Sequence, residues 1–193
     1  MVDQLEPHKT AVLLRVGRNV VIFARLEAQI SSLAARTRIS VGISLPDMKP
    51  IQVRSERKRK LSLGKLLDQL CANLFEDQEP LSPPRGYGGA WASHSFRIEM
   101  PKSEQKEWKR DLLSLVRERN HLIHAALAPL DLNSVEATRA FSEHLDDQYD
   151  RLGAAIEKLN GLAYQYVAFI KEAQQSMEAG NYSVVERNPS DVA

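Results

Sequence analysis

Apolar residues recur at helical spacing in four parts of the chain. Val12, Val16 and Val20 begin the first of these stripes, which Glu27 later interrupts. Pro7 suits the first turn of a helix, and Pro129 stops the third one. The pattern predicts helices over four ranges: Pro7 to about Thr37, Leu61 to Glu76, about Glu104 to Ala128, and Asn133 or Ser134 to Met177. The predicted fold class is therefore all-α, an antiparallel helical bundle with long first and last helices.

Two stretches between these helices are rich in helix breakers. VGISLPDMKP lies within residues 38–61 and PLSPPRGYGGA lies within residues 77–102, so both ranges are predicted to be loop excursions. SHSFRIEM could form a short strand, but a lone strand needs a partner. We expect one domain over residues 1–180 and a flexible tail over residues 181–193.

Overall composition narrows the class of protein. The chain has 193 residues, of which 43% are hydrophobic and 26% charged, and its net charge of +1 gives no general attraction to nucleic acid. Cys71 is the single cysteine, so no internal disulfide can form. MVDQLEPHKT does not resemble a signal peptide, and no apolar run reaches about 20 residues. We expect a cytoplasmic protein without membrane contact.

A local basic cluster departs from this neutral balance. RSERKRK, residues 54–60, has five basic residues against one acid. It is either a solvated basic loop or an electrostatic footprint for RNA phosphates. The candidate RNA-binding residues are Arg54, Arg57, Lys58, Arg59 and Lys60.

Arg119 interrupts the apolar stripe of the third helix. With about 100° per residue, Trp108, Leu112, Leu115 and Ile123 share one arc of that helix, and Arg119 lies inside it. A buried guanidinium is costly unless it is paired. Either it snorkels to a surface acid, or a carboxylate, a partner chain or a ligand phosphate faces it.

Asn120 and His124 share one side of the same helix, because they are four residues apart. Arg119 and His124 are five apart, about 140° around an ideal helix, so one helix does not point both at one spot without side-chain reach or a local change near Ala125. Two copies facing each other in a symmetric dimer would relax this constraint. His121 is expected to face solvent. An alternative without a functional role is that His124 is simply a cation that the dipole of the helix C-terminus stabilises.

The run RNHLIH, residues 119–124, resembles the motif of the HEPN superfamily (higher eukaryotes and prokaryotes nucleotide-binding), an arginine followed by a polar residue, three residues and a histidine. VGRNVVIFARLEAQISSL, LSLGKLLDQL and EHLDDQYDRL also look like segments of an uncharacterised bacterial HEPN-like group. The resemblance implies an all-α fold and a homodimer whose motif helices meet in a cleft.

The resemblance also implies RNA cleavage without a metal or other cofactor. Arg119 would bind the scissile phosphate, His124 would act as general acid or base, and Asn120 would orient one of them. An imidazole with an ordinary pKa of about 6.5 suits proton transfer near neutral pH. Such an endoribonuclease could be a toxin or phage-defence effector with an antitoxin protein as partner. The alternatives are a non-catalytic module that binds nucleotide, RNA or protein, and metal binding by His121 and His124.

Overall fold

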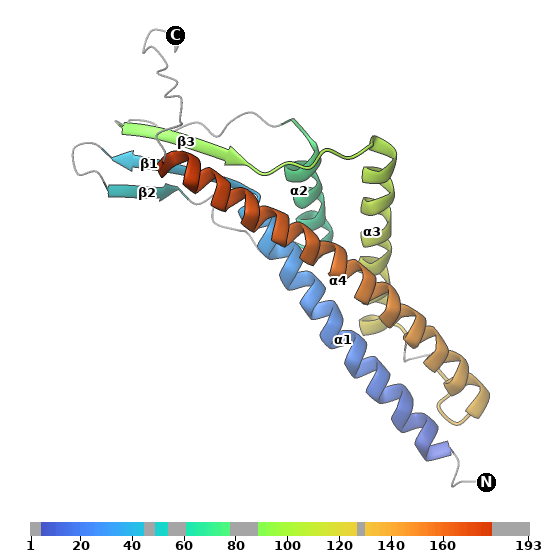
Figure 1. Cartoon of the computed structure of the whole chain (residues 1–193). Coiled ribbons are helices and arrows are strands. Elements are labelled where there is room, and N and C mark those ends of the chain that lie inside the picture. Colours follow the sequence, from blue (N-terminus) through green and yellow to red (C-terminus); the bar gives the residue numbers. More distant parts are fainter. Residues whose placement is uncertain (1–4, 45–48, 54–60, 78–88, 127–129, 179–193) are drawn as a thin grey trace.

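The computed structural model describes residues 5–44, 49–53, 61–77, 89–126 and 130–178. Two long helices dominate it, α1 (Leu5–Arg36) and α4 (Val135–Glu178), which lie side by side (Figure 1). Two shorter helices, α2 (Leu63–Phe75) and α3 (Lys102–His124), pack on one side of this pair. In the described part of the chain, no helix is long and apolar enough to cross a membrane.

The two long helices run in the same direction. Asn19 of α1 bonds Gln148 of α4, and further along both helices Gln29 bonds Asn160. Helix α3, which lies between α1 and α4 in the sequence, runs in the opposite direction (Figure 1). The helical bundle is confirmed, but its antiparallel arrangement is wrong for the pair α1 and α4. The reason is that α3 carries the chain back from the sheet end, so α4 begins at the same end of the bundle as α1.

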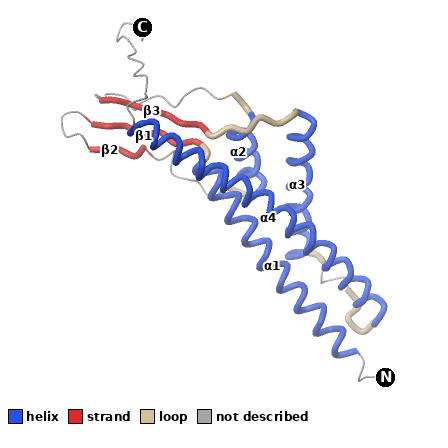
Figure 2. Tube along the Cα trace, in the orientation of Figure 1, coloured by secondary structure: helices blue, strands red, loops and turns tan. Residues whose placement is uncertain are grey.

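A three-stranded antiparallel sheet lies at the far end of the helices (Figure 2). Its strands are β1 (Arg38–Ser44), β2 (Lys49–Val53) and β3 (Gly89–Ser95), in the order β2-β1-β3. Ser40 lies opposite Val53 on one side and Ser93 on the other. The fold therefore contains a small sheet beside its helices, and the prediction of an all-α fold misses it.

The sheet corrects both predicted loop excursions. Within residues 38–61, the stretches 38–44 and 49–53 are strands, and within residues 77–102 the stretch 89–95 is a strand. Ile39, Val41 and Ile43 alternate as strand residues do, while Pro50 lies in β2, an edge strand where proline is tolerated. SHSFRIEM, considered a lone strand, overlaps the end of β3, whose partner is β1.

A single apolar core joins the four helices. Each helix turns its leucine-rich stripe inward, and burial of these side chains is the main favourable term for the fold. Phe96, just after β3, places its ring against Tyr166 and Phe169 of α4 and so ties the sheet to the core. Fully or nearly fully buried members include Phe23, Leu26, Ile30, Leu67, Leu70, Leu74, Leu112, Leu145, Leu152 and Leu159.

The end of α1 is fixed by a buried amide of α2. Asn73 Nδ2 donates to the carbonyl of Ala34 and to Thr37 Oγ1, each at 3.1 Å. These bonds satisfy groups that the end of a helix leaves open. The Phe96 amide then donates to the carbonyl of Thr37 at 2.9 Å, which holds the exit of β3 beside the entry of β1.

Helix boundaries agree with the sequence pattern to within a few residues. The Ala137 amide donates to Ser134 Oγ at 3.1 Å, so Ser134 caps α4. Ser62 precedes α2 without a side-chain capping bond. Helix α3 ends at His124, four residues before its predicted end at Ala128. The chain leaves the helix there because the amides of Ala125 and Ala126 both donate to the carbonyl of His121, at 2.8 and 2.9 Å.

Candidate functional site

The apolar stripe of α3 emerges from the core toward the end of the helix. Leu112 and Leu115 are buried, the side chain of Arg119 is 31% exposed, and Ile123 is 44% exposed. The guanidinium therefore lies at the margin of the core, where it reaches solvent. Position in the stripe alone does not bury it, because the stripe itself becomes more exposed from Leu115 to Ile123.

A carboxylate on α1 answers the question of what faces Arg119. Arg119 Nη2 donates to Glu27 Oε2 at 3.4 Å, and Nη1 donates to Asn120 Oδ1 at 3.1 Å. Glu27 is the residue that interrupts the apolar stripe of α1, so the two polar interruptions meet across the helix interface. The pair is part-exposed and long, so it contributes at most about 1 kcal/mol to stability.

The Arg119 guanidinium keeps unused donors. A guanidinium carries five N–H groups in a rigid fork, and these two bonds use two of them. Within the described residues, the other N–H groups have no hydrogen-bond partner. Glu27 and Asn120 thus hold the plane of the guanidinium while leaving it able to bind a further anion, such as a phosphate.

His124 is exposed and is the last residue of α3. No hydrogen bond or ion pair joins its side chain to another described residue. Asn120 and Arg119 are brought together by their hydrogen bond, whereas His124 is not brought to either of them within one chain. His121 is also exposed, as predicted. A single chain therefore presents a guanidinium and an imidazole on different sides of the same helix end.

Large apolar side chains are exposed around this helix end. Val20 lies two turns before Glu27 on the same side of α1, and Ile123 lies one turn after Arg119 on α3. Both are more than a third exposed, and Leu13, a further two turns back on α1, is 54% exposed. Because α1 and α3 run in opposite directions (Figure 1), all three of these residues lie on the side of the Glu27 and Arg119 pair that is nearer the start of α1.

A partly buried polar network holds α3 in place behind the site. Asn19 Nδ2 donates to Gln148 Oε1 at 3.0 Å, and Gln148 Nε2 donates to Glu118 Oε2 at 3.1 Å. Glu118 also pairs with Arg151. The network thus links α1, α4 and α3 one residue before Arg119, and it fixes the height of the α3 end relative to α1.

A charged cluster lies next to this network on the outside of α1 and α4. Asp146 accepts hydrogen bonds from Arg15 at 2.9 Å and from Arg18 at 2.8 Å, and these bonds hold the pKa of its carboxyl below the usual range. The guanidinium of Arg18 also lies 4.0 Å from the centre of the Tyr149 ring. These contacts strengthen the interface of the two long helices.

The predicted RNA-binding residues and the predicted metal site add nothing to the described site. Residues 54–60, with Arg54, Arg57, Lys58, Arg59 and Lys60, lie outside the described part of the structure. In the described ranges, no three His, Cys, Asp or Glu side chains gather as a metal site would require. The chain matched none of the protein families, curated proteins or solved structures with which it was compared.

Glu27 and Gln148 help to form the site, although neither was predicted from the sequence to belong to it. Glu27 carried a signal, because a charged residue on an apolar stripe calls for a partner, and Arg119 on another stripe calls for one too. Gln148 carried none, because a glutamine beside two aspartates in EHLDDQYDRL looks like any residue of a solvated face.

Proposed function

We propose that this protein is a metal-independent endoribonuclease of the HEPN type that acts as a homodimer. The observation that carries the proposal is the accessible end of α3, where Arg119 is held by Glu27 and Asn120 with donors to spare and His124 stands exposed five residues later. RNA supplies its own nucleophile, so cleavage needs a proton acceptor, a proton donor and stabilisation of charge on phosphorus.

In the proposed reaction the 2′-oxygen of RNA attacks the adjacent phosphorus. His124 takes the proton of the 2′-hydroxyl, the bond between phosphorus and the 5′-oxygen breaks, and the leaving oxygen takes up a proton from a second imidazole or from water. Arg119 donates to the phosphate oxygens as negative charge develops on them. The products are a 2′,3′-cyclic phosphate and a 5′-hydroxyl.

The dimer is part of this proposal because one chain separates its two catalytic groups. A two-fold axis near the end of α3 would bring Arg119 of one protomer toward His124 of the other. Exposed Val20 and Ile123 beside the site support this arrangement, since burial against a second copy would remove their apolar surface from water.

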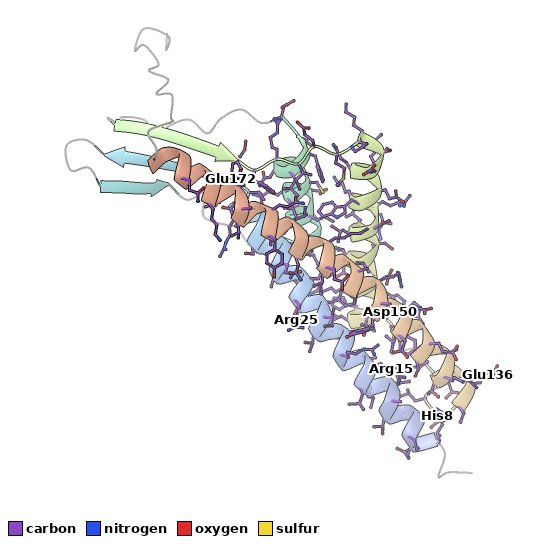
Figure 3. The ribbon with its side chains drawn as sticks, in the orientation of Figure 1. His8, Arg15, Arg25, Glu136, Asp150 and Glu172 are labelled. Carbon is purple, nitrogen blue, oxygen red and sulfur yellow. The ribbon has the colours of Figure 1, made fainter. Side chains whose placement is uncertain are left out.

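The test is RNA cleavage in excess EDTA by the purified protein and by Arg119→Ala and His124→Ala. His8→Ala is the matched control, because His8 is a histidine near the opposite end of α1 from the sheet (Figure 3). We expect the first two variants to lose at least about 100-fold in rate, His124→Ala because it removes a general acid or base and Arg119→Ala because it removes a donor to the developing phosphate charge. His8→Ala should keep the wild-type rate. Equal cleavage by all four proteins, or none by the wild type on any RNA, refutes the proposal.

Mixing the two inactive variants tests the shared site. In an equal mixture about half of the dimers are mixed, and each mixed dimer has one site with both Arg119 and His124. We expect the mixture to recover about a quarter of the wild-type activity. A mixture as inactive as its components would place both groups of each site in one chain.

The basic residues 54–60 are proposed to contact RNA phosphates that flank the cleaved bond. A plot of the logarithm of RNA affinity against the logarithm of salt concentration has a slope that grows with the number of phosphate contacts. Replacing Arg57, Lys58 and Arg59 by glutamine should then reduce this slope by the amount expected for about three contacts. An unchanged slope would make the segment an ordinary solvated loop.

A toxin or defence role is the biological setting that we propose for such a nuclease. Induced expression of the wild type should arrest bacterial growth, and expression of His124→Ala should not. The antitoxin would be a protein whose co-expression restores growth. RNA or nucleotide binding that persists in His124→Ala, without cleavage of any RNA by the wild type, would instead identify a non-catalytic binding module.

A further inference from the structure

A recess lies on the side of α3 that faces α4, away from Glu27. It has a volume of about 340 Å³ and is formed by the last turns of α3 and the first half of α4. This is at the small end of the range for ligand sites, about 300–1,000 Å³. It belongs to the same helix end as Arg119 and His124, but neither of these side chains lines it.

The recess has an apolar floor and an aromatic wall. Leu122 and Ala126 are buried at its base. The rings of Phe141 and His144, one turn apart on α4, are stacked with an interplanar angle of 25° and centroids 6.2 Å apart. A flat ring system could lie with one face against this wall and make more contact with it than a flexible aliphatic group could.

The rim carries side-chain donors that no described residue binds. Arg117 and His121 line the recess, and the side chain of neither makes a hydrogen bond or ion pair with another residue in the described ranges. Glu118 is the only acid among the lining residues of this recess, and it is already bound by Gln148, by Ser114 at 3.3 Å and by Arg151. The recess therefore combines a flat apolar interior with a rim suited to an anion.

We propose that this recess binds an unpaired nucleobase of single-stranded RNA, with the attached phosphate near Arg117 and His121. The inference rests on the proposed function and specifies its substrate class. Base stacking on aromatic side chains is tolerant of sequence, because every base has a flat face. A base inside a duplex is already stacked and cannot enter, so the recess selects single strands. A strand that passes round the end of α3 would meet the recess on one side and Arg119 on the other.

The experiment measures binding apart from cleavage. The probe is a short single-stranded RNA with 2′-O-methyl groups, which cannot be cleaved, carrying a fluorescent 2-aminopurine at its centre, and the competitor is the duplex of the same sequence. The variants are Phe141→Leu, which keeps apolar volume but removes the flat ring, and Arg117→Gln, an exposed change that leaves the core intact. Tyr164→Leu is the matched control on α4, because Tyr164 is 77% exposed and does not line the recess.

We expect wild-type protein to quench 2-aminopurine fluorescence and to prefer the single strand over the duplex. Phe141→Leu should bind about ten-fold more weakly and lose the quenching, Arg117→Gln should bind several-fold more weakly, and Tyr164→Leu should match the wild type within about two-fold. Circular dichroism checks that Phe141→Leu is folded, and if it is not, Arg117→Gln with the duplex comparison decides. Phe141→Leu equal to Tyr164→Leu, or equal binding of single strand and duplex, overturns the inference.

These results separate the inference from the proposed function. Cleavage that depends on His124 together with wild-type binding by Phe141→Leu removes the recess and leaves the nuclease. Binding that depends on Phe141, without cleavage of any RNA by the wild type, leaves the recess as the base site of a non-catalytic RNA-binding protein.

Discussion

Replacing Asn19 by leucine tests whether the buried polar network holds the three helices together. Asn19 is fully buried, its Nδ2 donates to the carbonyl of Leu145 at 2.8 Å and to Gln148 Oε1 at 3.0 Å, and its Oδ1 accepts from Arg18 Nε at 3.1 Å. Leucine has a similar volume and shape but no polar atom. The change therefore removes hydrogen bonds without opening a large cavity.

The expected cost follows from which groups lose their partners. The carbonyl of Leu145 still accepts from Arg18 at 3.2 Å, so it loses only one of its bonds, about 1 kcal/mol. Gln148 Oε1 is buried, and Asn19 is its hydrogen-bond donor among the described residues, so its loss costs about 1–3 kcal/mol. Buried apolar surface of the new leucine offsets part of this. We expect a net loss of about 2 kcal/mol, which lowers Tm by roughly 4–8 °C.

The assay is urea unfolding followed by circular dichroism at a fixed protein concentration, because dimer formation would add to the measured stability. The double variant Asn19→Leu/Gln148→Leu should lose about 1–2 kcal/mol less stability than the sum of the two single variants. Each single variant leaves the remaining amide of this pair without its partner, whereas the double variant removes both amides. Asn160→Leu, on the exposed side of the same interface, is the control and should change stability by less than about 0.5 kcal/mol. Full additivity of the double variant, or wild-type stability of Asn19→Leu, would refute the reasoning.

Three further predictions concern single side chains. Glu27→Gln removes the negative charge beside Arg119, so affinity for uncleavable RNA should rise several-fold in fluorescence anisotropy with little change in stability; weaker binding would contradict this. Asp146→Asn should cost about 0.5–1 kcal/mol at pH 7, a value kept small because the carboxylate is 43% exposed. Because the pKa of Asp146 is lowered in the folded state, this loss of stability is complete at pH values above the unfolded-state pKa, about 3.9. Urea unfolding at a series of pH values should show the loss disappear as the pH falls below the folded-state pKa. Burial raises the pKa of the Cys71 thiol to about 11, so iodoacetamide should label it only after unfolding, as followed by mass spectrometry; rapid labelling of the native protein would show an accessible thiolate.

The sheet shows where pattern analysis failed. β1 had alternating Ile39, Val41 and Ile43, but prolines on its far side favoured a loop, and its partner β3 lies about fifty residues later in the chain. Pairing between such distant segments leaves no periodicity that a local window can detect, and β3, GAWASHS, has no β-branched residue. The strands form because each satisfies the backbone groups of another.

For the candidate site, too, some features followed from the sequence and others only from the packing of the helices. That Arg119 needs a partner was determined by the sequence, because its position on an apolar stripe makes an unpaired guanidinium costly. Which residue pairs with it was decided by the packing of α1 against α3, which selects Glu27 from among the acids of the chain. The separation of His124 from Arg119 was also foreseeable, since five residues turn a helix by about 140°.

The sequence by itself determined the four helices and the polar residues that interrupt their apolar faces, because helix formation and side-chain direction depend on residues only three or four positions apart. Tertiary structure alone decided that α1 and α4 run parallel, that β3 joins β1 and β2 in one sheet, and that Asn19, Gln148 and Glu118 form one hydrogen-bonded network. These features depend on contacts between residues far apart in the chain. Their free energy appears only when the whole core closes, so no single segment encodes them.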